Sequence, residues 1–291
     1  MKSKFLFLVL GLFALCLFFI NCEEVTAPSA PTNLTLVGAE NGVKVKLTWN
    51  APTEATDGYY VYFKPVGSDT WQKTKLTGST TTSYVHDPNN KTGDYKVTAY
   101  KGDKESDPTA IKTTIPKETQ NITLNELNAT GNSGLGFDLT DGSAFAYSMV
   151  ATDAANKVDF YLTDFQSGAS TTNPFYLSSG DIVATSTENG RPSSTPTSGW
   201  RVNGILVNPF EDATNKVAKA GKDWVTTSPY QAYETFADNA TYGVTVNYGE
   251  TTPPSGKYYY GYIIVGSRSG TQITITKVYF QTVPNLRLLY K

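Results

Sequence analysis

Short segments in which apolar and polar residues alternate make up most of the first part of the chain. A strict period of two gives a β-strand one buried and one wet face, and the turn signals between the segments are typical of antiparallel pairing. The pattern predicts a sandwich of seven strands. These strands are expected at residues 34–36, 43–49, 60–64, 71–73, 82–85, 95–100 and 110–114.

Alternation continues after residue 117, but the connecting loops become longer and richer in Asn and Gly. One segment differs, because apolar residues recur at helical spacing from Pro209 to Trp224, which predicts a single short amphipathic helix. Many short strands with few helices indicate a second β-sandwich or a jelly-roll-like domain. Strands are expected at residues 122–127, 136–139, 144–150, 158–162, 182–184, 204–207, 242–246, 258–265, 272–281 and 286–290.

The first twenty-two residues have the pattern of an export signal. Lys2 and Lys4 precede an uncharged apolar run from Phe5 to Ile20, which is typical of a secretory signal peptide. The end of the run, Phe19-Ile20-Asn21-Cys22, resembles the lipobox of bacterial lipoproteins, and the resemblance implies that Cys22 is lipidated. We therefore expect a signal peptide at 1–21 and a lipidated tether at 22–30, with the mature chain held on the outer membrane, either facing inward or exposed at the surface.

Residues 31–116 resemble a fibronectin type III domain, which has an immunoglobulin-like fold. The resemblance rests on the opening strand Pro31–Leu36, on Trp49 in Leu47-Thr48-Trp49, on Tyr95-x-Val97-x-Ala99 and on Ser106-x-Pro108. It implies a two-sheet sandwich with Trp49 in the core. Residues 118–291 are only loosely similar to β-rich domains that accompany such modules in bacterial surface lipoproteins.

Charge and residue usage narrow the classes of function. The chain has 24 Lys and Arg against 26 Asp and Glu, a net charge of −2, so it has no electrostatic footprint for nucleic acid. His86 is its single histidine and lies in the first domain, which excludes a His-containing triad or a His-rich zinc site in the second. Removal of residues 1–21 would leave only Cys22, so no intramolecular disulfide is expected.

Carboxylates are the remaining candidates for metal binding or catalysis. Loop carboxylates supply the hard oxygen ligands that Ca²⁺ prefers, so Asp138, Asp141 and Asp159 are weak calcium candidates. The pairs Asp138 with Asp141 and Asp159 with Asp164 leave a carboxylate-based glycoside hydrolase as a less favoured alternative. No other cofactor is expected. The competing interpretation is that these residues cap local backbone donors in turns.

The segment Tyr258–Tyr262 has more aromatic rings than one core can take. In a strand, Tyr258, Tyr260 and Tyr262 face one side and Tyr259 the other, which predicts rings near solvent that could bind a sugar or a protein. The alternative is that tyrosine is simply a favoured strand residue at the rim of a core. The candidate ligand-binding residues are Tyr258, Tyr260, Tyr262, Trp200 and Trp224.

Together these features predict a lipid-anchored, non-catalytic binding or adhesion protein of the bacterial cell surface. Its expected partners are the membrane, through the anchor, and a glycan or a surface protein, through the second domain. An envelope scaffold or assembly subunit is the alternative.

Overall fold

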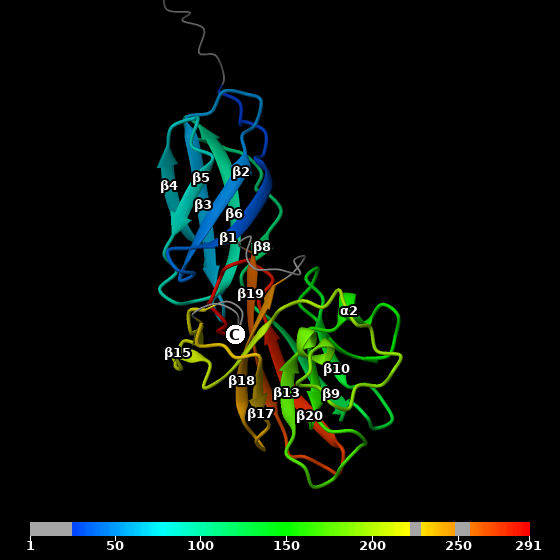
Figure 1. The fold of residues 1–291 in the computed structure, drawn as a ribbon. Helices are drawn as coiled ribbons and strands as arrows, with labels where there is room; N and C mark the ends of the chain where they lie inside the picture. The colour runs from blue at the N-terminus through cyan, green and yellow to red at the C-terminus, as the bar shows by residue number, and fades with distance from the viewer. Residues whose placement is uncertain (1–24, 222–227, 248–256) are drawn as a thin grey trace, which may run out of the picture.

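A computed structural model describes residues 25–221, 228–247 and 257–291, and over these residues the protein is almost entirely β-structure. Two sandwich domains follow one another along the chain and lie end to end (Figure 1). The described chain starts at the end of the first domain that faces away from the second domain, and the C-terminus lies where the domains meet. Cys22 and Trp224 lie outside the described residues.

The first domain has three strands in one sheet, in the order β1-β2-β5, facing a second sheet in the order β4-β3-β6-β7, with β8 also paired to β6. This arrangement is that of a fibronectin type III sandwich, as the sequence predicted. The strands are β1 Thr32–Ala39, β2 Lys44–Asn50, β3 Gly58–Pro65, β4 Gln72–Thr77, β5 Ser83–His86, β6 Gly93–Lys101, β7 Lys104–Glu105 and β8 Lys112–Thr113.

The core of the first domain forms around Trp49, as expected. Its indole ring contacts Tyr59 edge-on, with ring centroids 5.3 Å apart. Tyr95 is fully buried on β6, and its hydroxyl group lies 3.0 Å from Nδ1 of His86. The single histidine therefore closes one end of this core.

The second domain is also a sandwich, built from two five-stranded antiparallel sheets in the orders β11-β10-β12-β13-β17 and β14-β18-β19-β20-β9. The first sheet comprises β10 Gly134–Phe137, β11 Ala144–Tyr147, β12 Phe160–Thr163, β13 Tyr176–Ser179 and β17 Tyr233–Thr235. The second sheet comprises β9 Lys117–Asn125, β14 Gly204–Val207, β18 Thr241–Asn247, β19 Tyr258–Val265 and β20 Gln272–Phe280. A small hairpin of β15 Phe210–Asp212 and β16 Val217–Ala218 accompanies them.

Apolar side chains from both five-stranded sheets form one core between them. Phe137 of the first sheet stacks on Phe280 of the second, with ring centroids 4.3 Å apart. The first strand of the domain, β9, pairs with the last, β20, over almost its full length. The ends of the domain are thereby held in the same sheet.

Three local predictions for the second domain are wrong. The helix expected at 209–224 is the hairpin β15–β16 as far as the structure describes this segment, and the helices lie elsewhere, as α2 Ala154–Lys157 and a 3₁₀ turn Gly180–Ala184. That turn replaces the strand expected at 182–184. Residues 286–290 form no strand, although Leu288 makes one isolated bridge to Val217. In each case apolar residues are buried in clusters with distant parts of the chain, so their spacing does not fix the local element.

The C-terminal segment after β20 belongs to both domains. Val283, Leu286 and Leu288 are buried in the same hydrophobic cluster as Trp49 and the other core residues of the first domain. In the sequence these residues come after all the strands of the second sandwich. Their burial in the core of the first domain therefore gives the two domains one continuous apolar contact at their junction.

Hydrogen bonds fasten the same segment to the end of β1 and the turn that follows it. The amide of Gly38 donates to the carbonyl of Pro284 at 2.8 Å, and the amide of Arg287 donates to the carbonyl of Gly42 at 2.9 Å. A Cβ atom at Gly38 would lie 2.1 Å from the carbonyl oxygen of Asn285, so only glycine permits this approach. Arg287 is 2% exposed and also binds the carboxylate of Glu211 at 2.6 Å.

Candidate functional site

The tyrosine strand does not form the exposed surface that the sequence predicted. Tyr258, Tyr260 and Tyr262 are 1%, 6% and 6% exposed. The split between the two faces of β19 is real, because these three rings form a separate cluster while Tyr259 packs against the core between the sheets. Both faces are covered, so the rings are structural.

The cover over this outer face is the segment that was expected to be a helix. Phe210 of β15 contacts Tyr262 edge-on at 5.0 Å, and Ala218 of β16 is fully buried in the same cluster. The hydroxyl group of Tyr260 donates to the carbonyl of Gly221 at 2.5 Å. A hairpin laid flat on the sheet therefore replaces water as the neighbour of these rings.

Trp200 is also part of the interior, with 4% exposure. It packs in a third cluster with Tyr161 and Val158, and its indole nitrogen donates to the carbonyl of Pro196 at 2.9 Å. Trp200 is therefore not a solvent-facing platform. Trp224, the other predicted platform, lies outside the described residues.

The aspartates proposed for calcium make local contacts. Asp138 accepts the amide of Thr140 at 2.7 Å, and Asp141 accepts the amide and the hydroxyl group of Ser143, both at 2.8 Å. These are the turn caps of the competing interpretation. Over the described residues, no group of three or more His, Cys, Asp or Glu side chains is arranged to hold a metal ion.

Asp159 lies in the interior of the second domain and is fully buried. Arg201 binds its Oδ1 atom through Nε at 2.8 Å and through a terminal nitrogen at 2.7 Å, while the amide of Phe137 donates to Oδ2 at 3.0 Å. Asn203 adds bonds to the carbonyl and the carboxylate of Asp159. This carboxylate ties the loop before β14 to the strand β12, and its oxygens are occupied.

Three buried carboxyl groups, Glu126, Asp164 and Glu188, come together beside β12, and of these the sequence singled out only Asp164. The amide of Asn128 donates to one oxygen of Glu126 at 2.8 Å, but the other oxygen of Glu126 has no hydrogen-bond partner among the described residues. Burial, followed by the negative charges of Asp164 and Glu188, raises the pKa of Glu126 to about 7. Burial therefore favours the protonated form of Glu126 below that pH.

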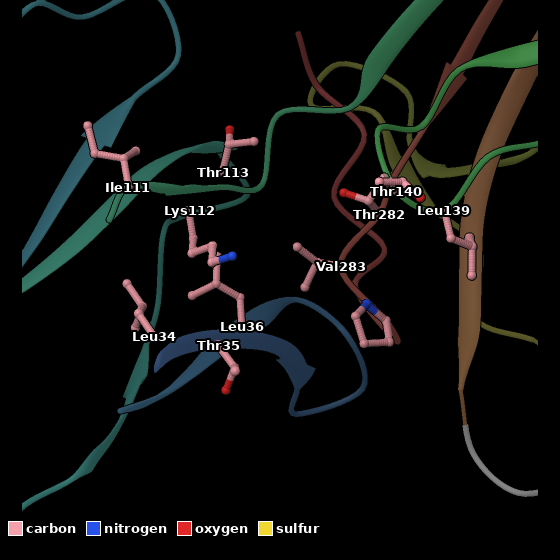
Figure 2. Close-up of a pocket in the computed structure, with 11 residues that line it drawn as sticks. Leu34, Thr35, Leu36, Ile111, Lys112, Thr113, Leu139, Thr140, Thr282 and Val283 are labelled. Carbon is pink, nitrogen blue, oxygen red and sulfur yellow. The ribbon is translucent and has the colours of Figure 1, made fainter. Parts of the chain in front are cut away.

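A groove lined by residues of both domains lies at the domain junction (Figure 2). It has a volume of about 410 Å³, and side chains from four separate segments surround it. Its walls are apolar, with threonine hydroxyl groups and the charged side chain of Lys112. The lining residues are Leu34, Thr35, Leu36, Ile111, Lys112, Thr113, Leu139, Thr140, Thr282, Val283 and Pro284.

A second candidate surface lies on the solvent side of the β4-β3-β6 sheet of the first domain. Alternation on β3 turns Tyr59, Val61 and Phe63 into the core and Tyr60, Tyr62 and Lys64 outward. Register then places Lys75 beside Tyr60, and both Lys73 and Lys96 beside Tyr62. We call this surface the lysine–aromatic face; it comprises Tyr60, Tyr62, Lys64, Trp71, Lys73, Lys75, Lys96 and Tyr100.

Each lysine of this face is held over an aromatic ring. The ammonium of Lys73 lies 3.6 Å from the ring centroid of Tyr60, and that of Lys75 lies 4.7 Å from Tyr100. Lys64 and Lys96 share Trp71, at 5.2 and 4.6 Å. A cation over a ring gains about 0.5–1 kcal/mol at exposed sites, so these flexible side chains are partly ordered before any partner arrives.

Two carboxylates balance part of the charge. Glu105 accepts Lys73 at 2.6 Å, and Asp94 lies 3.4 Å from Lys64. Burial opposes ionisation of Glu105, yet hydrogen bonds from Lys73, Thr98 and Tyr62 hold its pKa below the ordinary value. Within the described chain, Lys75 and Lys96 have no carboxylate partner, so the face keeps an excess of positive charge.

Sequence reasoning found the strands of this face but not the face itself. The signal was present in the outward positions 60, 62 and 64 and in the lysines at 73 and 75. What was missing was the cross-strand register, which decides that lysines and rings from three strands meet.

Three solved structures that resemble this protein each align with about a third of the chain. An Fn3-like protein from Clostridium thermocellum is 26% identical and aligns with 30% of this chain and 92% of its own, at a TM-score of 0.26. The FN5 domain of Drosophila Lar is 15% identical and aligns with 30% of this chain and 94% of its own, at a TM-score of 0.26. An fn3 domain of the human collagen alpha-1(XX) chain is 14% identical and aligns with 32% of this chain and 89% of its own, also at a TM-score of 0.26.

Neither the family models nor the curated proteins include a match to the chain. Among the described residues, no helix is long and apolar enough to cross a membrane.

Proposed function

We propose that the protein is a lipid-anchored, non-catalytic binding protein of the cell envelope. The observation that carries this proposal is the end-to-end arrangement of the domains, in which the described chain begins at the far end of the first domain (Figure 1). An anchor at Cys22 would hold that end at the membrane and direct the second domain away from it. The first domain would then act as the spacer. Its strand β1 has 8 residues, which at about 3.3 Å per residue extend over roughly 26 Å.

The junction between the domains supports a role in presentation. The buried residues Val283, Leu286 and Leu288 and the hydrogen bonds to Gly38 and Gly42 leave little freedom for one domain to swing on the other. A rigid spacer keeps a binding surface in a fixed direction and lowers the entropy lost when several copies bind one partner. The same rigidity favours the second candidate function, an envelope scaffold or assembly subunit.

Fractionation of cells tests the anchor. The full chain should partition into the detergent phase, and Cys22→Ala should move it to the aqueous phase. Cys16→Ala is the matched control, because it removes the other cysteine of the same apolar run and should leave partitioning unchanged. If Cys22→Ala stays in the detergent phase, the anchor proposal is wrong.

A capture assay separates binder from scaffold. Substitutions on a solvent-facing surface should abolish capture of a partner by a binding protein while leaving its folding intact. For a scaffold, disruption of the domain junction should instead abolish assembly, with solvent-facing substitutions having no effect.

A further inference from the structure

We infer that the lysine–aromatic face binds the acidic groups of a polysaccharide, with Lys64, Lys96 and Trp71 at its centre. The inference rests on the proposed binding function and names its site and the class of its ligand. Lys64 and Lys96 lie over the same indole ring, at 5.2 and 4.6 Å from its centroid. Asp94 balances only one of these two positive charges, so an anion placed beside both ammonium groups is attracted by the charge that remains.

Lysines that are already ordered make better anion ligands than free ones. Because Lys64, Lys75 and Lys96 each lie over a ring, less side-chain entropy is lost when an acidic group binds. Glu105 fixes the middle of the face through Lys73, Tyr62 and Thr98. The face is therefore preorganised. Within the described chain Lys96 has no carboxylate partner and Lys64 has only Asp94, at 3.4 Å, so this pair keeps a net positive charge for an incoming anion.

The carboxylates of the face favour a sugar polymer over other polyanions. Asp94 lies among the lysines and can accept hydrogen bonds from hydroxyl groups, which a polysaccharide carries on every residue. Single-stranded DNA carries a phosphate on every nucleotide but no sugar hydroxyl groups along its chain, so it offers Asp94 none of these donors. A polymer that carries hydroxyl groups beside its acidic groups matches this mixture of cations and acceptors.

Binding of defined polymers to the full chain in mild detergent tests the inference. Polygalacturonate and dextran sulfate should bind, with affinity falling as salt is raised, whereas neutral dextran should not. Lys64→Gln combined with Lys96→Gln should weaken binding at least about tenfold, because two charge pairs are lost. An unchanged thermal melt would confirm that this variant is folded.

The matched control is Lys46→Gln combined with Lys91→Gln, which removes the same charge from exposed positions outside the face. Its affinity for polygalacturonate should remain within about twofold of the parent chain. Equal loss in this control would show non-specific charge attraction and overturn the inference. Equal binding of polyglutamate or single-stranded DNA, or no binding of either acidic polysaccharide, would also overturn it, whatever the outcome of the Cys22→Ala fractionation.

Discussion

Glu126 is a residue whose ionisation the fold opposes. Its side chain is fully buried, one carboxylate oxygen has no hydrogen-bond partner among the described residues, and Asp164 and Glu188 lie close enough to repel a third negative charge. A buried carboxyl group in such surroundings holds its proton more tightly than the same group in the unfolded chain. Unfolding therefore releases a proton at mildly acidic pH.

The sign of the pH dependence follows from that release. The pKa of Glu126 is about 7 in the folded state against 4.5 for an ordinary glutamate, so stability is lost as pH rises through this interval. Glu126→Gln should remove the loss and, at about pH 8, raise the free energy of unfolding by about 3 kcal/mol at most. Urea denaturation of both chains across this pH range measures the difference.

Glu54 provides the control for this prediction. It is exposed, so Glu54→Gln should change the free energy of unfolding by no more than about 0.5 kcal/mol. This variant should still lose stability as pH rises through the interval between the unfolded and folded pKa values of Glu126. Parallel pH profiles for Glu126→Gln and the parent chain would contradict the argument.

At the scale of elements, the hairpin β15–β16 decides the role of the tyrosine strand. Without this hairpin, Tyr258, Tyr260 and Tyr262 would face water, and the strand would offer an aromatic surface. With it, Ala218 is fully buried against the rings, and the outer face of β19 becomes a small core of its own.

Two substitutions of the same kind test that cover. Ala218→Asp places a carboxylate in the tyrosine cluster and should cost about 3 kcal/mol or more in the free energy of unfolding, because at a fully buried position the larger side chain must displace packed rings and lose its water. Ala213→Asp, in the same hairpin but exposed, should change it by no more than about 0.5 kcal/mol. Similar small costs for both would mean that the hairpin does not cover the strand.

At the scale of the whole molecule, the C-terminal segment divides its side chains between the domains. Leu288 lies in the cluster of the first domain, whereas its neighbour Leu289 lies in the tyrosine cluster of the second, and both are fully buried. The segment thus connects two cores with adjacent residues, and the stability of the first domain depends on the end of the chain.

Hydrogen exchange of the full chain can separate the contribution of Leu288 to the first domain from that of Leu289 to the second. Leu288→Ala should cost about 2–5 kcal/mol locally and speed exchange in β2 and β6, although these strands are far away in sequence. Leu289→Ala is the matched control and should speed exchange in β19 instead. If Leu288→Ala leaves the first domain protected, the C-terminal segment does not support it.

The sequence by itself determined the period of the strands and therefore the class of the fold. β14 and β19 begin and end where alternation predicted them, and Trp49 occupies the expected core position, because strand formation and the burial of one face depend on neighbours along the chain. The two-sided nature of the tyrosine strand was also readable, since successive side chains must point to opposite faces.

Only the tertiary structure decided what covers each face. The same apolar positions in 209–221 fit a helix or a hairpin, and the choice came from contact with Tyr262 and Arg287, which are distant in sequence. Likewise, Lys73, Tyr62 and Lys96 become neighbours only when β4, β3 and β6 pair in one register. The local spacing of apolar residues predicts which side chains become buried. The segment that covers them depends on the packing of the whole chain.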